Sequence, residues 1–222
     1  MTGLILKLIA VVTMIIDHSG AIVFPGDIAF RYIGRLAFPL FCFLLTEGFI
    51  HTKNLFGYMI RLLVFAVISE VPFDWGLYGE YVHMDHQNVF WTLLLGLMAI
   101  SCMELVQLEN IYLTFMARCV IAVPYAALAQ FLKTDYRAVG VLLIVSMYLL
   151  KSCFPAMIAA GGVLLSPLFS SQIEICALLS YIPMYFYNGE RGRVGRIGKW
   201  GFYVFYPLHF VILGLIRDLL WT

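Results

Sequence analysis

An aspartate and a histidine stand side by side inside an apolar run near the start of the chain. Residues 4–16 carry one charge, Lys7, and lead directly to Asp17 and His18. A charged side chain near the middle of a bilayer costs about 2.5–3.5 kcal/mol even on the most lenient insertion scale. We therefore expect this pair to face other helices rather than lipid, and to take part in chemistry inside a membrane.

The composition also places the chain in a membrane. It has 222 residues, of which 63% are hydrophobic and 12% charged, and its mean hydropathy is +0.93. Soluble domains are about 45–50% apolar and about 25% charged. No stretch is polar enough for a separate soluble domain, so we predict an all-α, polytopic bundle of transmembrane helices that forms a single domain over residues 1–222.

Several classes of ligand are disfavoured by the same numbers. The net charge of +1 argues against a nucleic-acid partner, because phosphate backbones are bound by many cationic side chains. The five cysteines lie scattered in apolar runs, without a second Cys or a His at metal-ligand spacing. We interpret them as small buried hydrophobic residues and predict no metal site.

The hydropathy pattern predicts eight or nine membrane spans, since about 20 apolar residues cross a bilayer as a helix. The candidate spans cover residues 4–23, 30–50, 56–73, 88–107, 112–132, 137–154, 155–169, 172–187 and 202–221. The seventh lies between Pro155 and Pro167 and is short enough to be a half-span or a re-entrant segment. Without it, eight spans remain.

The charges of the loops predict an orientation. The loop at 74–86 carries three acidic residues and no Lys or Arg, whereas the loop at 188–201 carries four cationic residues and one glutamate. The positive-inside rule places the second loop in the cytoplasm. With nine spans, the N-terminus is then cytoplasmic as well. The basic loop could hold a phosphate through its backbone amides, or simply lie near anionic lipid.

Depth along the predicted helices sorts the polar residues into two groups. The group predicted near the outer side contains Asp17, His18, Arg31, Arg35, Ser69, Glu70, Asp74, His83, His86, Gln87 and Asn88. The group predicted near the inner side contains Glu47, His51, Thr52, Lys53, Arg61 and the basic loop. His209 lies between the two groups and shares a helical face with Tyr206, three residues earlier.

Each of the central polar residues has a structural as well as a functional interpretation. Adjacent residues on a helix point about 100° apart, so Asp17 and His18 each need a separate partner, which could be Arg35, Arg61 or a ring from another span. His18 is either a catalytic group or a buried hydrogen-bonding residue. Asp17 is either functional or part of a structural ion pair, and Arg35 is either its counter-ion or a clamp for an anion.

Several short sequences along the chain carry a family resemblance. They are LKLIA (6–10), MIIDH (14–18), GRLAFPLF (34–41), EGF (47–49), HTKN (51–54), RL (61–62), SEVPFD (69–74), HQNVF (86–90), DY (135–136), YNG (187–189) and FYPLH (205–209). Together they resemble TraX proteins over nearly the whole chain. Residues 100–130 and 155–170 match only by hydropathy.

The resemblance implies an activity. TraX proteins are conjugation-linked membrane proteins associated with N-terminal acetylation of F-type pilin. They look distantly similar to larger membrane acyltransferases that carry a His late in the first span. For this chain, the resemblance implies an integral membrane O- or N-acetyltransferase in the bacterial cytoplasmic (inner) membrane, with acetyl-CoA as the donor. The acceptor would be an amine or a hydroxyl on a pilin-like N-terminus, a glycan or a lipid.

On this hypothesis, the polar residues take three roles. The catalytic candidates are His18 as general base, Asp17 or Glu70 to orient it or to help gather the acceptor, and His209 as an alternative base or acetyl relay. The candidates for binding the substrate or the oxyanion are Arg35, Asp74, His86, Asn88 and Tyr206. The candidates for binding the CoA phosphates are Lys53, Arg61, Arg191, Arg193, Arg196 and Lys199.

Two other functions remain open. Ionisable residues within the membrane also line the pathways of transporters and channels, although the chain shows no inverted repeat and no matching pair of broken helices. Alternatively, the protein is a scaffold or assembly partner whose polar residues hold helices together. In that case, Asp17→Asn and His18→Gln would reduce folding yield rather than a catalytic rate.

Overall fold

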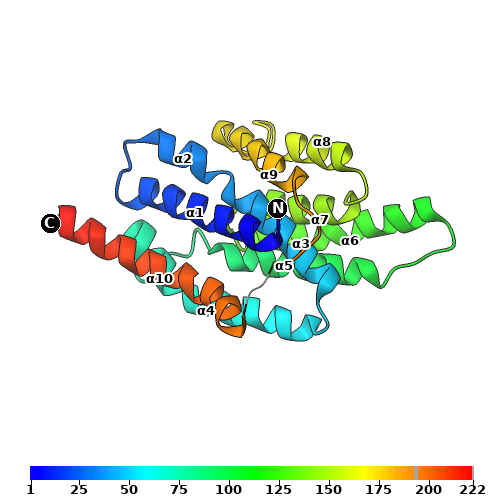
Figure 1. Cartoon of the computed structure of the whole chain (residues 1–222), viewed down its shortest axis with the longest axis horizontal. Coiled ribbons are helices and arrows are strands. Elements are labelled where there is room, and N and C mark those ends of the chain that lie inside the picture. Colours follow the sequence, from blue (N-terminus) through cyan, green and yellow to red (C-terminus); the bar gives the residue numbers. More distant parts are fainter. Residues whose placement is uncertain (193–194, 222) are drawn as a thin grey trace.

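The described part of the protein consists of helices and the loops between them, which confirms the predicted all-α class. The computed structural model describes residues 1–192 and 195–221, with side chains for all of these except 196–199 and 221. In chain order, its helices are α1 (Gly3–Ile22), α2 (Ile28–Gly34), α3 (Ala37–His51), α4 (Leu55–Tyr78), α5 (Val89–Glu104), α6 (Ile111–Phe131), α7 (Arg137–Leu149), α8 (Phe154–Leu164), the 3₁₀ helix η1 (Gln172–Ser180), α9 (Tyr181–Tyr185) and α10 (Arg196–Trp221). Figure 1 shows them as a bundle in which most helices run along its long axis.

Five helical segments of the described chain are long and apolar enough to cross a membrane. They are α1, the α2–α3 segment, α4, α6 and most of α10. The shorter apolar helices α5, α7 and α8 complete the bundle. The protein is therefore a multi-pass membrane protein.

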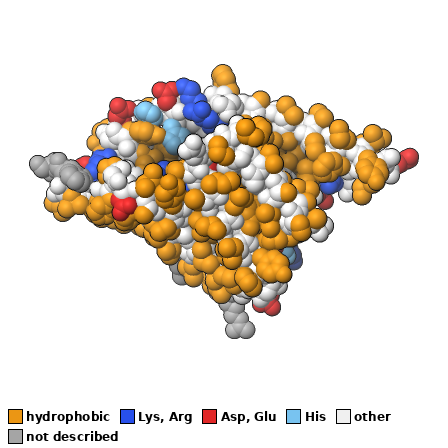
Figure 2. Space-filling model, turned by 90° about the horizontal axis from the view of Figure 1, so that it is seen from above, with side chains coloured by type: hydrophobic (Ala, Val, Ile, Leu, Met, Phe, Trp, Pro, Cys, Tyr) orange, Lys and Arg blue, Asp and Glu red, His pale blue; other side chains and the backbone are white. Residues whose placement is uncertain are grey.

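The surface has the apolar character that contact with lipid requires. Large hydrophobic side chains such as Phe56, Tyr112 and Phe131 are at least 75% exposed on α4 and α6, and hydrophobic side chains cover much of the face seen in Figure 2. A soluble monomer rarely exposes apolar patches of this extent. The charged and histidine side chains visible in Figure 2 gather mainly at its edges.

The predicted span at 30–50 is divided into two helices by a joint at Arg35 and Leu36. Just before this joint, α2 approaches α1 so closely that a Cβ added to Gly34 would lie 2.1 Å from the Cβ of Asp17. Only a residue without a side chain fits there. The joint therefore places Arg35 directly beside α1.

The predicted span at 172–187 is not a single helix, which corrects that prediction. The structure has the nine-residue η1 followed by the five-residue α9, although 3₁₀ helices are seldom longer than about 3–4 residues. Glu174 of η1 is buried and pairs with Arg35. The segment consequently packs on α2 and α3 instead of crossing the bundle as one α-helix.

The central helix of the arrangement is α1. It packs against α2, α3 and α10, while α10 also packs against α4; Figure 1 shows α1 between α2 and α10. Farther along the chain, α5 and α6 pack on α7. The polar residues of the first, second and last predicted spans are thereby brought to one region.

Candidate functional site

Two histidines from opposite ends of the chain meet inside the bundle. Nδ1 of His18 on α1 lies 2.7 Å from Nε2 of His209 on α10. Their rings stack with centroids 4.9 Å apart, and the ring of Phe210 packs on His18 at 4.5 Å. Of the partners expected for His18, the structure therefore shows a ring from another span, that of His209.

The second nitrogen of His209 determines where the protons lie in this pair. Nδ1 of His209 is 3.2 Å from the backbone oxygen of Phe205, and a carbonyl oxygen can only accept a hydrogen bond. With both rings neutral, His209 donates to Phe205 through Nδ1 and accepts from Nδ1 of His18 through Nε2. Nε2 of His18, which has no hydrogen bond to a described residue, then carries the lone pair that can take a proton.

The Asp17 carboxylate is held by two arginines and not by His18. Its Oδ2 lies 2.8 Å from Nη1 of Arg31 and 2.5 Å from Nη2 of Arg35. Nη1 of Arg35 lies 2.7 Å from Oε1 of Glu174. Because each charge has a partner of opposite sign, the network can remain buried in the bundle. This corrects the expectation that Asp17 orients His18. Of the arginines expected as partners of Asp17, the structure shows Arg35 and not Arg61, and it adds Arg31.

A small cavity lies among these residues, and we call it the central cavity. Its volume is about 90 Å³, and its lining includes Asp17, His18, Arg31, Arg35, His86 and Tyr206. Five of the residues predicted to be catalytic or to bind substrate thus surround one space. The hydroxyl of Tyr206 also accepts a hydrogen bond of 3.5 Å from the backbone N–H of Val89.

Glu70 and Asn88 stabilise the start of α5 and do not line the central cavity. Nδ2 of Asn88 donates to Oε1 of Glu70 at 2.7 Å, and its Oδ1 accepts from the N–H of Phe90 at 3.0 Å. Oε1 of Glu70 also accepts from Nε1 of Trp91 at 2.6 Å. Asn88 is thus a buried N-cap. This geometry corrects the predictions that Glu70 orients His18 and that Asn88 stabilises an oxyanion.

Asp74 likewise lies outside the central cavity. It is 4% exposed, and its Oδ2 accepts a hydrogen bond of 2.8 Å from the backbone N–H of His83. This bond holds the α4–α5 loop against the end of α4. The structure therefore gives Asp74 a position that stabilises the loop, away from the predicted substrate site.

His86, in the α4–α5 loop, reaches the central cavity from outside the spans. Its Nδ1 lies 2.6 Å from the hydroxyl of Tyr78, and its Nε2 lies 3.2 Å from Oδ1 of Asp135. Burial lowers the pKa of His86, but the hydrogen bond and the charge of Asp135 outweigh this effect, so the pKa lies above its ordinary value. The arrangement favours an imidazolium ion at this edge of the cavity.

A larger cavity lies near the other end of α1, and we call it the basal cavity. It has a volume of about 490 Å³, and Lys7, Glu47, His51, Arg61, Arg191 and Trp200 are among its lining residues. Lys7 precedes His18 by three turns of α1, or about 16 Å along the helix axis. The two cavities therefore lie along the same helix, with cationic side chains at one end and the histidine pair at the other.

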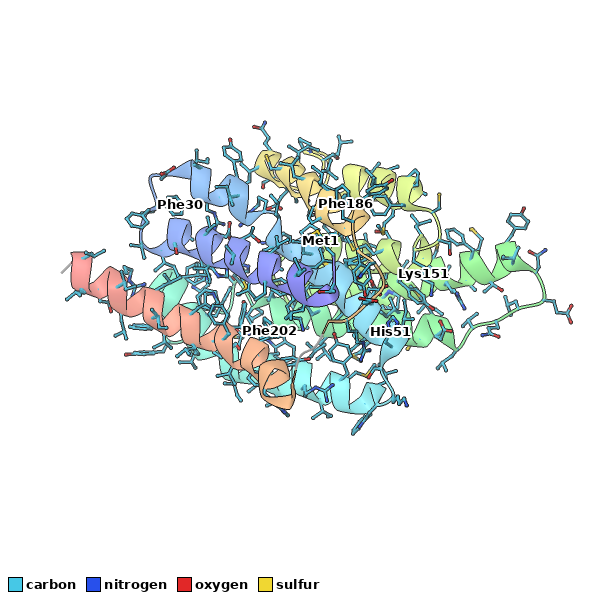
Figure 3. All side chains as sticks on the ribbon, viewed as in Figure 1. Met1, Phe30, His51, Lys151, Phe186 and Phe202 are labelled. Carbon is cyan, nitrogen blue, oxygen red and sulfur yellow. The ribbon has the colours of Figure 1, made fainter. Side chains whose placement is uncertain are left out.

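The start of the chain is tied to the segment that carries Arg191. The N-terminal amino group of Met1 donates to the backbone oxygen of Phe186, and the two residues lie side by side in Figure 3. The backbone N–H of Leu4 donates to the oxygen of Arg191 at 3.0 Å. These bonds bring Arg191 to the basal cavity.

The structure places the residues predicted to bind CoA in different positions. Arg61 and Arg191 line the basal cavity, whereas Lys53 is exposed and does not. Arg193 lies outside the described residues, and so do the side chains of Arg196 and Lys199. The basal cavity is also lined by Lys7, for which no role in binding was predicted from the sequence.

Two acidic residues at the site were missed from the sequence. Glu174 contacts Arg35, and its presence within an apolar segment was the available signal. Asp135 was noted only as part of the family resemblance, but it contacts His86 and lines the central cavity. Both belong to loops or short helices whose position depends on the packing of other elements.

Comparison with known proteins places the chain in a family. The family described as "TraX protein" matches residues 2–217. The "Probable fimbrial assembly protein FimC, serogroup H1" of Dichelobacter nodosus is 30% identical over 94% of this chain and 92% of its own length. An uncharacterized protein of Rickettsia prowazekii (strain Madrid E), RP591, is 34% identical over 30% of this chain and 25% of its own length. No solved structure gives a significant match. The chain belongs to the TraX family.

Proposed function

We propose that this protein is a membrane acetyltransferase that moves an acetyl group from acetyl-CoA to a hydroxyl or amine acceptor. The observation that carries the proposal is the histidine pair. Nε2 of His209 accepts a hydrogen bond from Nδ1–H of His18, so Nε2 of His18 is a base that lines the central cavity. A base in such a place is expensive to maintain in a membrane and has an evident use in proton abstraction.

The transfer step balances with the groups present. Nε2 of His18 takes the proton from the acceptor as the acceptor oxygen or nitrogen attacks the thioester carbonyl. The carbon–sulfur bond then breaks, and the thiolate of CoA receives the proton from the His18 imidazolium. The products are the acetylated acceptor and CoA thiol, with no oxidant or further reactant needed.

The arginines beside His18 supply positive charge where the oxyanion forms. Arg35 is fixed by Asp17 and Glu174, whereas Arg31 uses one terminal nitrogen for Asp17 and lines the cavity. The remaining N–H groups of Arg31 and the Nε–H of Arg35, which has no hydrogen-bond partner among the described residues, are the donors available to an oxyanion. In the partly buried surroundings of Arg31, a fixed positive charge stabilises a developing negative charge more than it does in bulk solvent.

The basal cavity suits the donor. Lys7, Arg61 and Arg191 provide cationic groups for phosphates, and Trp200 and Tyr203 provide aromatic surface for a base. Glu47 is the opposing charge in the lining. We place this cavity, and with it the N-terminus, on the cytoplasmic side of a bacterial inner membrane, where acetyl-CoA is available and where the basic loop agrees with the positive-inside rule.

The test is turnover of radiolabelled acetyl-CoA by the protein purified in detergent, with and without extract of host membranes. We expect release of CoA and a labelled membrane product, and a loss of about 100-fold or more in a His18→Gln variant, as for removal of a general base. The variant must show the same thermal unfolding as the natural protein. Equal turnover by a folded His18→Gln variant would refute the role of His18.

A role in assembling surface fibres is the second candidate, because the Dichelobacter nodosus relative is described as a fimbrial assembly protein. In that role, the buried polar residues would hold helices together. This candidate predicts that deletion of the gene reduces assembled fibres and that His18→Gln restores them as well as the natural protein does. Loss of fibres with both the deletion and His18→Gln would instead link assembly to catalysis.

A further inference from the structure

A third cavity lies where α4 ends and where α5 and α7 begin, and we call it the loop cavity. It has a volume of about 550 Å³. Four of its lining residues also line the central cavity, namely Arg35, His86, Asp135 and Tyr136. The basal cavity shares no lining residue with either of them. A molecule in the loop cavity is therefore separated from the space around His18 by a single layer of side chains.

The carboxylates of the loop cavity are already neutralised. Each of its three carboxylates forms a pair with a cationic or protonatable side chain. The pairs are Asp85 with Lys133, Asp135 with His86, and Glu174 with Arg35. Lys133 holds the pKa of the Asp85 carboxyl below its ordinary value. Oε2 of Glu174 is buried without a hydrogen-bond partner among the described residues, but Arg35 already balances the charge of this carboxylate. An ammonium group that entered this cavity would therefore lose its hydration without gaining an uncompensated negative charge, which is unfavourable.

The uncompensated charge of the loop cavity is positive. Arg137 lines it, is exposed, and has no ion pair or side-chain hydrogen bond to a described residue. It is also the first residue of the 13-residue α7. The N–H groups of Ala138 and Val139 have no acceptor in the described chain. Cationic charge and unpaired N–H groups at the start of a helix both favour an anion.

The backbone that presents Arg137 is strained. The described residues other than glycine with positive φ are Lys133 at 53°, Tyr136 at 60° and Arg137 at 47°, and all three lie within five residues. Such conformations cost about 1–3 kcal/mol each and tend to cluster at ligand sites. The ring of Tyr136 stacks on Phe38 with centroids 3.7 Å apart, so packing against α3 maintains the strained segment.

Hydroxyl and amide side chains complete the lining. Gln130, Thr134, Ser170 and Ser171 lie around the loop cavity with Tyr78. Each of these side chains can both donate and accept a hydrogen bond. A hydroxyl group on a ligand has the same double capacity, whereas a protonated amine only donates and a hydrocarbon chain does neither.

We propose that the loop cavity binds a negatively charged, hydroxyl-bearing head group of the glycerol phosphate or sugar phosphate type, and that this ligand is the acetyl acceptor. The assignment of this ligand as the acetyl acceptor rests on the proposed function, whereas its binding in the loop cavity does not. The anionic group lies against Arg137 and the start of α7. A hydroxyl of the ligand then faces the shared wall formed by Arg35 and His86, beyond which lies His18.

The test measures binding of glycerol 3-phosphate to the protein in nanodiscs of phosphatidylcholine, with ethanolamine as the cationic comparison. We expect glycerol 3-phosphate to bind and ethanolamine not to bind. Arg137→Gln should weaken the binding at least tenfold, and Lys151→Gln, which removes a cation near the other end of α7, should leave it unchanged. No binding at millimolar concentrations, stronger binding of ethanolamine, or equal binding by Arg137→Gln would overturn the proposal.

Two further measurements separate the sources of the ligand and the two proposals. Thermal stabilisation by phosphatidylglycerol but not by phosphatidylethanolamine in the nanodisc, lost in Arg137→Gln, would identify a lipid head group. Binding of the soluble probe without this stabilisation would identify a free phosphate ester. If glycerol 3-phosphate binds but is not acetylated in the presence of acetyl-CoA, the binding site stands and its role as the acceptor site fails. Absence of CoA release with any acceptor would refute the proposed function and with it the role of the ligand as the acceptor, while the binding site would stand.

Discussion

Nδ1 of His18 lies 2.7 Å from Nε2 of His209, although 191 positions separate the two residues in the sequence. The contact joins α1 to α10 at the central cavity. Because His209 also donates to the backbone of Phe205, it sets the tautomer of His18. His209, on the last helix, thus determines which ring nitrogen of His18 can act as a base.

Replacing His209 tests this dependence. His209→Phe keeps an aromatic ring but removes the acceptor for His18, so we expect CoA release to fall about 10- to 100-fold, less than the loss for the base itself. His209→Gln retains an amide oxygen that can accept from His18 and should keep more activity than His209→Phe. The pH profile of turnover should shift in both variants, and unchanged activity and pH profile in His209→Phe would contradict the role.

The buried ion network predicts a large effect on stability. Asp17→Asn leaves Arg31 and Arg35 without their shared carboxylate and should cost about 3–5 kcal/mol, as for one partner removed from a buried pair. Combining it with Arg35→Gln should cost less than the sum of the two single changes, because the partners interact directly. Unfolding in detergent measures each cost. Asp27→Asn is the control, since Asp and Asn cap α2 equally well.

The close approach of α2 to α1 predicts that Gly34 cannot be enlarged. In Gly34→Ala, the new Cβ would lie 2.1 Å from the Cβ of Asp17, so α2 must shift and stability should fall by about 1–3 kcal/mol or more. Gly26→Ala is the matched control, because nothing lies within 4 Å of a Cβ added there. Equal thermal unfolding of the two variants would show that the helices do not pack as described.

The pair of His86 and Asp135 predicts a dependence on pH. The folded-state pKa of His86 is raised, so the pair's stabilisation is fully present below the unfolded pKa of about 6.5 and is lost as the pH rises through the folded pKa. Asp135→Asn should lower the pKa of His86, which NMR titration of labelled histidine can follow. The stability difference between this variant and the natural protein should shrink as the pH rises from about 6.5. A constant difference would exclude the ion pair as its cause.

The basal cavity predicts a specific effect on the donor. Arg61→Gln removes a cation from its lining and should raise the KM for acetyl-CoA about tenfold, the effect of losing about 1.4 kcal/mol of binding, with a smaller change in kcat. Lys53→Gln removes an exposed cation that does not line the cavity and should leave the KM unchanged. The reverse order of effects would place the donor outside the basal cavity.

The class of the protein and the identity of its central residues follow from the amino-acid sequence alone. The hydropathy of the chain requires helices in a membrane, because backbone polar groups in lipid must bond within the segment. The same physics singled out Asp17, His18 and His209, since polar groups within an apolar helix need partners. The short seventh segment was also evident from its two prolines, and the structure has the 11-residue α8 there.

The partner of each of these residues depends on how the helices pack in three dimensions. A position in the sequence gives depth along a helix but not the direction from which another helix arrives. Asp17 therefore meets Arg31 and Arg35, and Glu70 holds the N-cap residue Asn88 of α5, so neither carboxylate orients His18. Glu174 in the 3₁₀ helix pairs with Arg35, a contact that spans 139 positions. Such long-range contacts are fixed by packing, and no local pattern of residues determines them.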